Sequence, residues 1–228
     1  MENIVSLQKV TKDYGEGDAL THALRGIDLM VEPGEFTAMA GPSGSGKSTL
    51  LNIIGGLDRP TTGRVEVDGR EINTLSKTEL SLLRRDRIGF IFQSYNLIPV
   101  LTALENAEYV LMLQGISTAE RRERVGEILK EVGLEGLENR YPWQLSGGQQ
   151  QRVAIARAIV SEPALVLADE PTANVDSDTG KSLLDLMRRL NEEKGVTFFF
   201  STHEEAVMKR ARRLLQIRDG VIFNDQGH

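Results

Sequence analysis

Apolar residues in the first third of the chain fall into short runs that predict β-strands. Turn signals at residues 32–35 (EPGE) and 68–69 (DG) separate the runs, because proline and glycine favour tight turns. The third run leads into a glycine-rich loop, after which the apolar positions 50–54 predict the start of a helix. The predicted strands are Ile4–Val10, Leu24–Val31, Phe36–Ala40 and Arg64–Val67.

The middle of the chain has a different pattern, which predicts helices. Two segments match a capping box, in which a hydroxyl accepts from a backbone N–H of the first turn and an acid lies at the positive helix end. Each box is expected to open a helix of about 10 to 15 residues, so residues 95–160 should be mainly helical. The two pairs are Thr102 with Glu105 and Ser117 with Glu120.

After Pro163 the alternation of strands and helices returns. The runs 164–169 and 196–201 are apolar almost throughout, which is typical of strands covered on both faces of a sheet. A strand over 88–92 is also expected before the helical region. Helices should follow over 177–193 and from His203.

A final hairpin around Asp219-Gly220 completes the predicted order of elements. The pattern as a whole predicts an α/β core that carries a helical insertion. We expect a single domain over residues 1–228, with 1–94 and 161–228 forming the core and about 95–160 forming the insertion.

Residues 41–48 read GPSGSGKS, which fits the phosphate-loop pattern G-x-x-x-x-G-K-[ST]. Its glycines let successive backbone N–H groups point at a phosphate, and the following helix adds its positive N-terminal end. Lys47 is expected to reach the β and γ phosphates, and the Ser48 hydroxyl to coordinate Mg²⁺. Nucleotide binding is therefore predicted. The residues assigned to it are Gly41, Ser43, Gly44, Ser45, Gly46, Lys47, Ser48 and Thr49.

Paired acids, Asp169 and Glu170, end the apolar run that begins at residue 164. The strand would place both carboxylates at its C-terminal edge, where ligands bind in open α/β sheets. Asp169 suits a metal ion, directly or through water. Glu170 is suited to orient or deprotonate an attacking water, as a hydrolase requires.

A second anion-binding segment lies between the phosphate loop and the acidic strand, where residues 145–152 read LSGGQQQR. It offers a serine, two glycines and a helix N-terminus, but no lysine or metal ligand, so it is a weak triphosphate site by itself. In this order, the phosphate loop, this segment and the acids resemble ABC-type ATPases, whose signature motif the segment matches. The residues assigned to it are Ser146, Gly147, Gly148 and Gln149.

The resemblance covers nearly the whole chain. It implies a P-loop ATPase core of the ABC type, with an antiparallel β subdomain and the inserted helical subdomain. It also implies that ATP and Mg²⁺ bind and that ATP is hydrolysed. Because the signature segment lacks a lysine, the economical reading is a head-to-tail dimer in which Ser146 of one copy caps the nucleotide of the other.

Further residues take their roles from the resemblance. Tyr14 matches the aromatic that stacks on adenine, with an ordinary turn tyrosine as the alternative. Gln93 matches the glutamine that contacts Mg²⁺ and the attacking water, and His203 matches the histidine that bonds the γ-phosphate. The implied catalytic residues are Lys47, Gln93, Glu170 and His203, and the implied metal-binding residues are Ser48, Gln93 and Asp169.

One loop departs from the family pattern. The chain has Ala173-Asn174 where a serine–alanine pair is usual, so only Asp176 is carried over as a dimer contact near the nucleotide. His22 and His228 have no comparable context and are assigned no role.

The composition narrows the class of partner. With 27 Lys and Arg against 33 Asp and Glu, the net charge is −6, which argues against a nucleic-acid partner. The absence of cysteine excludes disulfides, thiolate metal sites and a cysteine nucleophile. No apolar run approaches the roughly 20 residues that span a bilayer. An acid in the Met1-Glu2-Asn3 start predicts no signal peptide, so a cytosolic location is expected.

Residues 89–99 (GFIFQSYNLIP), 101–106 (LTALEN) and 169–176 (DEPTANVD) are similar to ATPase subunits of lipoprotein-releasing and macrolide-exporting systems. Cell-division subunits and antimicrobial-peptide transporters share much of this pattern, and amino-acid importers somewhat less. The resemblance implies an ATPase on the cytoplasmic side of the inner membrane. It would power export or extraction of a lipoprotein, macrolide or peptide through membrane permease subunits.

We expect these permease subunits to dock near Gln93–Pro99, at the apolar segment 97–99. Core packing is the alternative role for that segment. Two other classes remain open at this point. A soluble ABC ATPase acting on DNA or ribosomes would not copurify with membranes, and a small-molecule kinase would release no phosphate without an acceptor.

Overall fold

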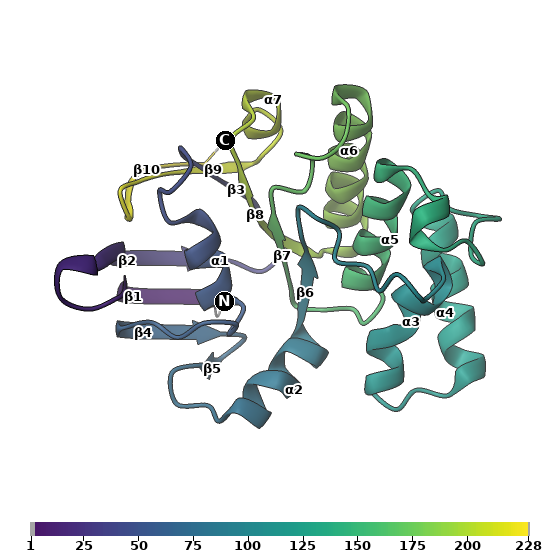
Figure 1. Ribbon diagram of the computed structural model, residues 1–228, viewed down its shortest axis with the longest axis horizontal. Coiled ribbons are helices and arrows are strands. Elements are labelled where there is room, and N and C mark those ends of the chain that lie inside the picture. Colours follow the sequence, from purple (N-terminus) through teal and green to yellow (C-terminus); the bar gives the residue numbers. More distant parts are fainter. Residues whose placement is uncertain (1–2, 228) are drawn as a thin grey trace.

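The computed structural model describes residues 3–227, with the backbone alone at positions 18 and 206. Met1, Glu2 and His228 lie outside the described residues. The chain forms two sheets with helices packed between and beside them (Figure 1). The strands are β1 (Val5–Tyr14), β2 (Thr21–Val31), β3 (Phe36–Ala40), β4 (Thr62–Val67), β5 (Arg70–Glu71), β6 (Ile88–Ile91), β7 (Leu165–Asp169), β8 (Thr197–Thr202), β9 (Arg213–Arg218) and β10 (Val221–Gly227). The α-helices are α1 (Lys47–Ile54), α2 (Lys77–Arg87), α3 (Ala103–Leu113), α4 (Thr118–Glu131), α5 (Gly147–Ile159), α6 (Ser177–Lys194) and α7 (Glu205–Met208), with 3-10 turns η1 (Gly17–Ala19) and η2 (Pro142–Gln144).

The larger sheet has six strands in the order β10-β9-β3-β8-β7-β6. All pairings from β9 to β6 are parallel, and β10 is an antiparallel edge strand. The carboxyl ends of β3, β7 and β8 therefore meet at one edge, with Ala40 opposite Thr202 and Asp169 opposite Ser201. The loops that leave this edge carry the phosphate loop, the paired acids and His203.

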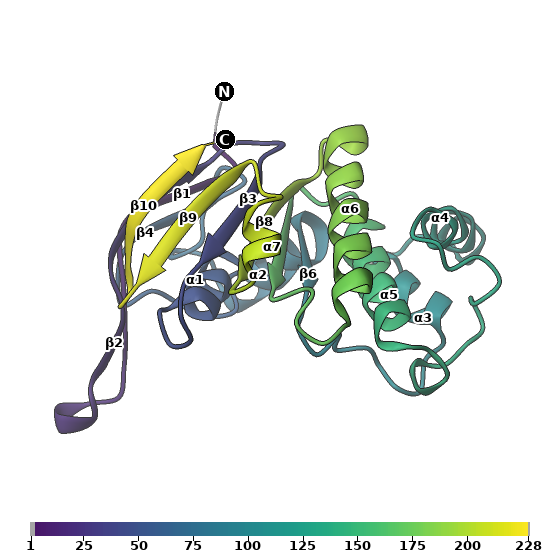
Figure 2. The ribbon, with the colours of Figure 1, turned by 90° about the horizontal axis from the view of Figure 1, so that it is seen from above.

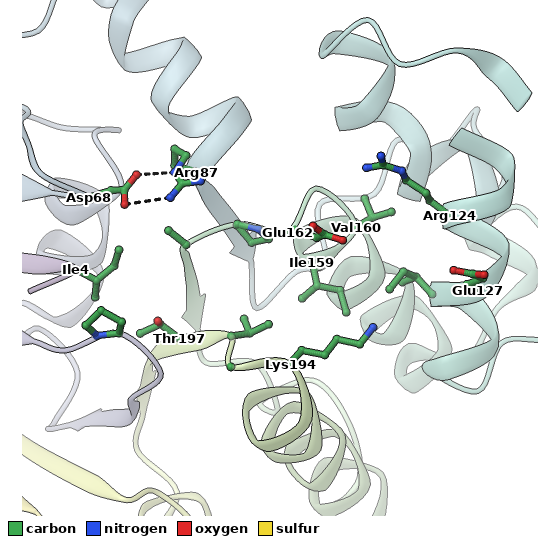
Figure 3. Close-up of a pocket in the computed structure, with 16 residues that line it drawn as sticks. Ile4, Asp68, Arg87, Arg124, Glu127, Ile159, Val160, Glu162, Lys194 and Thr197 are labelled. Atoms are coloured by element: carbon green, nitrogen blue, oxygen red, sulfur yellow. Dashed lines mark hydrogen bonds and ion pairs between the residues drawn. The ribbon is translucent and has the colours of Figure 1, made fainter. Parts of the chain in front are cut away.

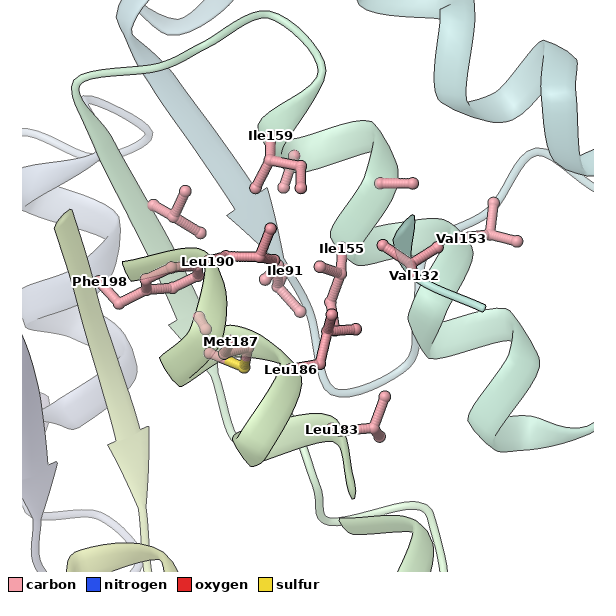
Figure 4. Packing of buried hydrophobic residues seen from close by; sticks show 14 of the residues in the cluster. Ile91, Val132, Val153, Ile155, Ile159, Leu183, Leu186, Met187, Leu190 and Phe198 are labelled. Atoms are coloured by element: carbon pink, nitrogen blue, oxygen red, sulfur yellow. The ribbon is translucent and has the colours of Figure 1, made fainter. Parts of the chain in front are cut away.

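The central strands are buried on both faces, as their apolar runs predict. In β8, Phe198 and Phe200 belong to one apolar cluster and Phe199 to the other, because successive side chains point to opposite faces. The first cluster includes residues of α5 and α6 (Figure 4), and the second includes residues of α1. Helices α1 and α5 thus pack on opposite faces of the six-stranded sheet.

The smaller sheet has the order β2-β1-β4-β5 and is antiparallel throughout. Its inner face joins the cluster that contains α1, so α1 is enclosed between the two sheets. The far end of the β1–β2 hairpin projects from the body of the molecule, as both ribbon views show (Figure 2). The predicted antiparallel subdomain is this sheet.

The helical region contains α3, α4 and the start of α5 on the far side of the larger sheet (Figures 1 and 2). Its apolar residues belong to the same cluster as those of β7, β8 and α6, so the region has no separate core. Thr102 and Glu105 form the predicted capping box. The second box is half formed: Ser117 accepts from the backbone of Glu120, whose carboxylate instead pairs with Arg124 at 2.6 Å.

The structure corrects one further prediction and contains one helix that was not predicted. The helix expected from His203 begins at Glu205 and is only four residues long, so His203 lies in the turn before it. Helix α2 was not predicted, although Ser76 and Glu79 form a complete capping box at its start. The helix is strongly polar and buries only Leu80 and Leu83, which gives a weak apolar pattern.

Candidate functional site

The phosphate loop joins the carboxyl end of β3 to α1 and is closely packed. A Cβ at Gly41 would lie 2.2 Å from the Ile217 carbonyl oxygen, and one at Gly46 would lie 2.7 Å from that of Ala23. Gly46 also has a φ of 104°, which disfavours any residue with a side chain. The Ser45 carbonyl oxygen accepts from the Gly220 N–H at 3.0 Å. These contacts explain why the loop requires glycine at both positions.

Lys47 and the start of α1 provide the positive charge of the loop. The Lys47 side chain is buried, and its Nζ donates to the carbonyl oxygens of Gly41 (2.7 Å) and Pro42 (3.0 Å). No side chain caps the N-terminus of α1, so its first N–H groups remain available to an anion. Ser48, one residue into the helix, is exposed.

Asp169 and Glu170 lie at the carboxyl end of β7, as predicted. The Ser201 hydroxyl joins them: it donates to Asp169 Oδ1 (2.5 Å) and accepts from the Glu170 N–H (3.0 Å). Glu170 has a left-handed φ of 44°, and its Oε1 lies 3.1 Å from His203 Nδ1. The Glu170 side chain is only 20% exposed, against 57% for His203. The geometry pairs the predicted base with the predicted histidine.

His203 also lies close to the phosphate loop. It lines a cavity of about 350 Å³ together with Gly41 and Pro42, and another of about 210 Å³ together with Asp176. The turn after β8 thus places His203 between the phosphate loop and the segment that carries Asp176, at one edge of the sheet.

Tyr14 ends β1 and is 42% exposed. Its hydroxyl donates to Asp58 Oδ2 at 2.7 Å, and Lys12 Nζ lies 4.7 Å from the ring centroid. Partial burial and the bond to Asp58 raise the pKa of Tyr14, while the neighbouring Thr49 hydroxyl lowers it. Partial burial alone would raise the pKa of Asp58, but hydrogen bonds from Lys12 and Tyr14 lower it overall. The ring is therefore held beside the helix that follows the phosphate loop.

The signature segment forms the N-terminus of α5. Ser146 is the N-cap: its hydroxyl accepts from the Gln149 N–H (3.3 Å), and Gln149 Oε1 accepts from the Ser146 N–H (2.9 Å). Gly147 and Gly148 allow close packing, since a Cβ would lie 2.7 Å from the Tyr95 hydroxyl at the first and 2.4 Å from Thr179 Cγ2 at the second. The two glycines therefore leave room for the side chains of Tyr95 and Thr179.

Gln93 and Asp176 lie in loops that contact each other. The Asn174 side chain donates to the Gln93 carbonyl oxygen at 2.9 Å, and Gln93 itself is exposed. Asp176 caps α6 by accepting from the N–H groups of Asp178 (3.1 Å) and Thr179 (3.0 Å).

The segment expected to dock permease subunits, residues 97–99, is partly packed against the core and partly exposed. Leu97 packs against the larger apolar cluster, as the core alternative anticipated. The Asn106 amide holds the Ile98 backbone, and Pro99 is exposed.

A cavity of about 810 Å³ lies at the other edge of the larger sheet, where β7 and β8 begin (Figure 3). Ile4, Ile159 and Lys194 help to line it, and none of the predicted site residues is among those that do. Three charged side chains at this cavity are already paired within the chain: Arg87 with Asp68, Arg124 with Glu120, and Lys194 with Glu131. We therefore place the candidate site at the opposite edge, with the phosphate loop.

Sequence reasoning missed two residues of this site. Ser201 joins the two acids, and the only signal for it was its place at the end of a strand beside Asp169. Asp58 holds Tyr14 from a turn after α1, and nothing in its local sequence marks it.

Within residues 3–227, no cluster of three or more His, Cys, Asp or Glu side chains forms a metal site. In the same range, no helix combines the length and apolar character needed to cross a membrane.

A phosphate loop and a strand-end acid pair on one edge of a mainly parallel sheet define a P-loop nucleoside triphosphatase. The comparisons with known proteins give the family. The ABC transporter family model matches residues 24–173. An uncharacterised ABC transporter ATP-binding protein of Methanocaldococcus jannaschii is 48% identical over 98% of this chain and 97% of its own length. The macrolide export ATP-binding/permease protein of Syntrophobacter fumaroxidans is 48% identical over 99% of this chain, which spans 32% of that protein.

Solved structures agree. A dimeric ATP-binding cassette in a post-hydrolysis state, bound to ADP and Pi, superposes with a TM-score of 0.91 at 48% identity, covering 98% of both chains. CbiO1 of Clostridium perfringens, part of an ABC transporter complex, has a TM-score of 0.90 at 30% identity, covering all of this chain and 89% of that one.

The chain belongs to the ABC transporter family, as one of its ATP-binding, ATP-hydrolysing cassettes. Its matches to macrolide-export proteins confirm the predicted branch. The small-molecule kinase and the soluble ATPase acting on DNA or ribosomes are set aside.

Proposed function

We propose that the chain is the ATPase subunit of a membrane exporter, in which two copies enclose two ATP molecules and drive partner permease subunits from the cytoplasmic face. The macrolide-export relatives, in which an ATP-binding part like this chain is joined to a permease part, support this proposal. A lipoprotein, a macrolide or a peptide is the substrate class that we propose.

The observation that carries the proposal is the separation of two anion-binding helix ends in one chain. The phosphate loop opens α1 and the signature segment opens α5, and these helices pack on opposite faces of the same sheet. Ser146 is therefore suited to a nucleotide held by another copy. The dimeric structures of similar cassettes support the same arrangement.

The chemistry follows from the edge of the sheet. Lys47 and the N–H groups of α1 bind the phosphates. Glu170, aligned by His203, takes a proton from the attacking water, and the His203 ring holds the γ-phosphate from the same side. The Tyr14 ring stacks on the adenine of the nucleotide. Gln93 orients the water from its own loop.

Mg²⁺ fits the donors that these loops offer, because a hydroxyl, a carboxylate and an amide oxygen are hard ligands of the type it prefers. Ser48, Asp169 and Gln93 would hold it, and the Ser201 hydroxyl orients the Asp169 carboxylate. When bound, the ion would neutralise charge on the phosphates.

The test uses Glu170→Gln, which keeps the shape of the side chain and removes the base. We expect its phosphate release to fall at least about 100-fold, and ATP with Mg²⁺ to shift it from monomer to dimer on sizing. Adding Ser146→Arg should abolish the dimer while one-site ATP binding remains. A Glu170→Gln protein that binds ATP and stays monomeric would refute the shared site.

A further inference from the structure

The segment that carries Gln93, residues 93–96 (the Gln93 loop), is fastened to the segment that leads to Asp176, residues 173–176 (the Asp176 loop). Two hydrogen bonds run in opposite directions between them. The Asn174 amide donates to the Gln93 carbonyl oxygen at 2.9 Å, and the Tyr95 hydroxyl donates to the Asn174 carbonyl oxygen at 3.0 Å. The loops are about 80 residues apart in sequence, so only the fold brings them together.

The Tyr95 hydroxyl also lies against the signature segment. A Cβ at Gly147 would come within 2.7 Å of it, so Gly147 leaves the space that this hydroxyl fills. The side chain is half-buried, and burial raises the pKa of Tyr95 above its ordinary value. The Tyr95 side chain therefore connects its own Gln93 loop to both the Asp176 loop and the signature segment.

A third contact fixes the backbone of the Gln93 loop. The Arg157 guanidinium, on α5, donates to the carbonyl oxygens of Asn96 (2.6 Å) and Tyr95 (2.9 Å). These two residues have left-handed φ values of 48° and 60°, a region that residues other than glycine adopt uncommonly. The loop is thus set in one conformation by α5 and by the Asp176 loop.

We propose that Tyr95 and Asn174 are positioning residues, which set the Gln93 side chain by fastening its loop to the Asp176 loop. The inference rests on the proposed function, in which Gln93 orients the attacking water and Asp176 lies at the dimer contact. Neither residue touches a reacting atom. Through this pair of bonds, a shift of the Asp176 loop moves the backbone of Gln93, so hydrolysis responds to the partner copy.

The experiment compares Tyr95→Phe, which removes only the hydroxyl, with Asn174→Asp, which keeps the shape but cannot donate to the Gln93 carbonyl. Each should lower kcat about three- to tenfold, the effect of losing one hydrogen bond. The Kd for ATP should stay within about twofold and Tm within about 2 °C, because phosphate binding and the core are untouched. Tyr109→Phe, an exposed tyrosine on α3, is the matched control and should hydrolyse ATP like the wild type.

The double variant should lose no more activity than the worse single variant, since both substitutions break one connection. Wild-type kcat in both single variants would overturn the proposal. So would parallel losses of kcat, ATP affinity and Tm, which indicate a purely structural role. In a Glu170→Gln background, Asn174→Asp should still form the ATP-dependent dimer. If Glu170→Gln alone stays monomeric, the shared-site function fails, whereas the effects on kcat still report separately on the two positioning residues.

Discussion

At the scale of single residues, Asp176 combines a structural role with the dimer-contact role that we propose for it. Its carboxylate accepts from two backbone N–H groups at the start of α6 and from the Thr179 hydroxyl at 2.6 Å. These bonds, the Thr179 hydroxyl first, lower the pKa of Asp176. A residue carried over as a dimer contact is therefore also the N-cap of an 18-residue helix.

Two substitutions of Asp176 separate the contribution of helix capping from that of the carboxylate charge. Asn caps helices about as well as Asp, so Asp176→Asn should leave Tm at pH 7 nearly unchanged, whereas Asp176→Ala should lower it by a few degrees. Because the pKa of Asp176 is lowered in the folded state, its carboxylate stabilises the fold at pH values above its ordinary pKa of about 3.9. This stabilisation is lost as the pH falls through the folded-state pKa. Thermal melts from pH 7 to pH 3 should therefore show a larger loss for wild type than for Asp176→Asn. Equal losses would contradict the carboxylate's role.

At the scale of helices, α5 and α6 meet at a contact that only glycine permits. The Cβ of any other residue at position 148 would lie 2.4 Å from the methyl group of Thr179. Because Thr179 also bonds Asp176, this contact joins the signature segment to the Asp176 loop.

Gly148→Ala should therefore destabilise the protein, although alanine is the better helix former. Thr179→Ser removes the obstructing methyl group and keeps the hydroxyl that bonds Asp176. We expect Gly148→Ala to lower Tm by several degrees and the double variant with Thr179→Ser to recover most of the loss. A double variant no more stable than Gly148→Ala would place the strain elsewhere.

The elements also show what local sequence can predict. Continuous apolar runs located β7 and β8, and the parallel sheet then placed Asp169 and His203 at the edge that carries the phosphate loop. Helix α2 was not predicted because its sequence pattern is polar. Only one of the two hydrogen bonds of the second capping box forms, because the Glu120 carboxylate pairs with Arg124 instead. The hydrogen bond from Tyr95 to the Asp176 loop depends on the tertiary fold, and no local pattern encodes it.

At the scale of the whole molecule, Arg213 of β9 ties the two sheets together. Its guanidinium binds Asp225 of β10 at 2.7 Å, the Met30 carbonyl oxygen of β2 at 2.7 Å, and Glu35 at 3.0 Å. Its hydrogen bonds lower the pKa of Asp225. The side chain is only 21% exposed, and its removal would take the charged partner from Glu35, which is itself only 19% exposed.

Arg213→Met should consequently lower the free energy of unfolding by about 2 kcal/mol and Tm by roughly 4 to 8 °C. Arg218→Met, at the exposed end of the same strand, is the control and should change Tm by less than about 2 °C. Chemical denaturation with both variants measures the difference. Matching midpoints would show that Arg213 does not join the sheets.

The order of strands has a consequence for synthesis of the chain. Within the described part of the chain, β3, which precedes the phosphate loop, pairs only with β8 and β9, and these lie more than 150 residues later. As the ribosome releases the chain, β3 therefore has no strand partner until residues 197–218 emerge. The smaller sheet, whose strands all lie within residues 5–71, is complete long before. Nucleotide binding is thus acquired only after β8 and β9 have been made, and a chain broken off before them lacks the strands that flank β3 and support its phosphate loop.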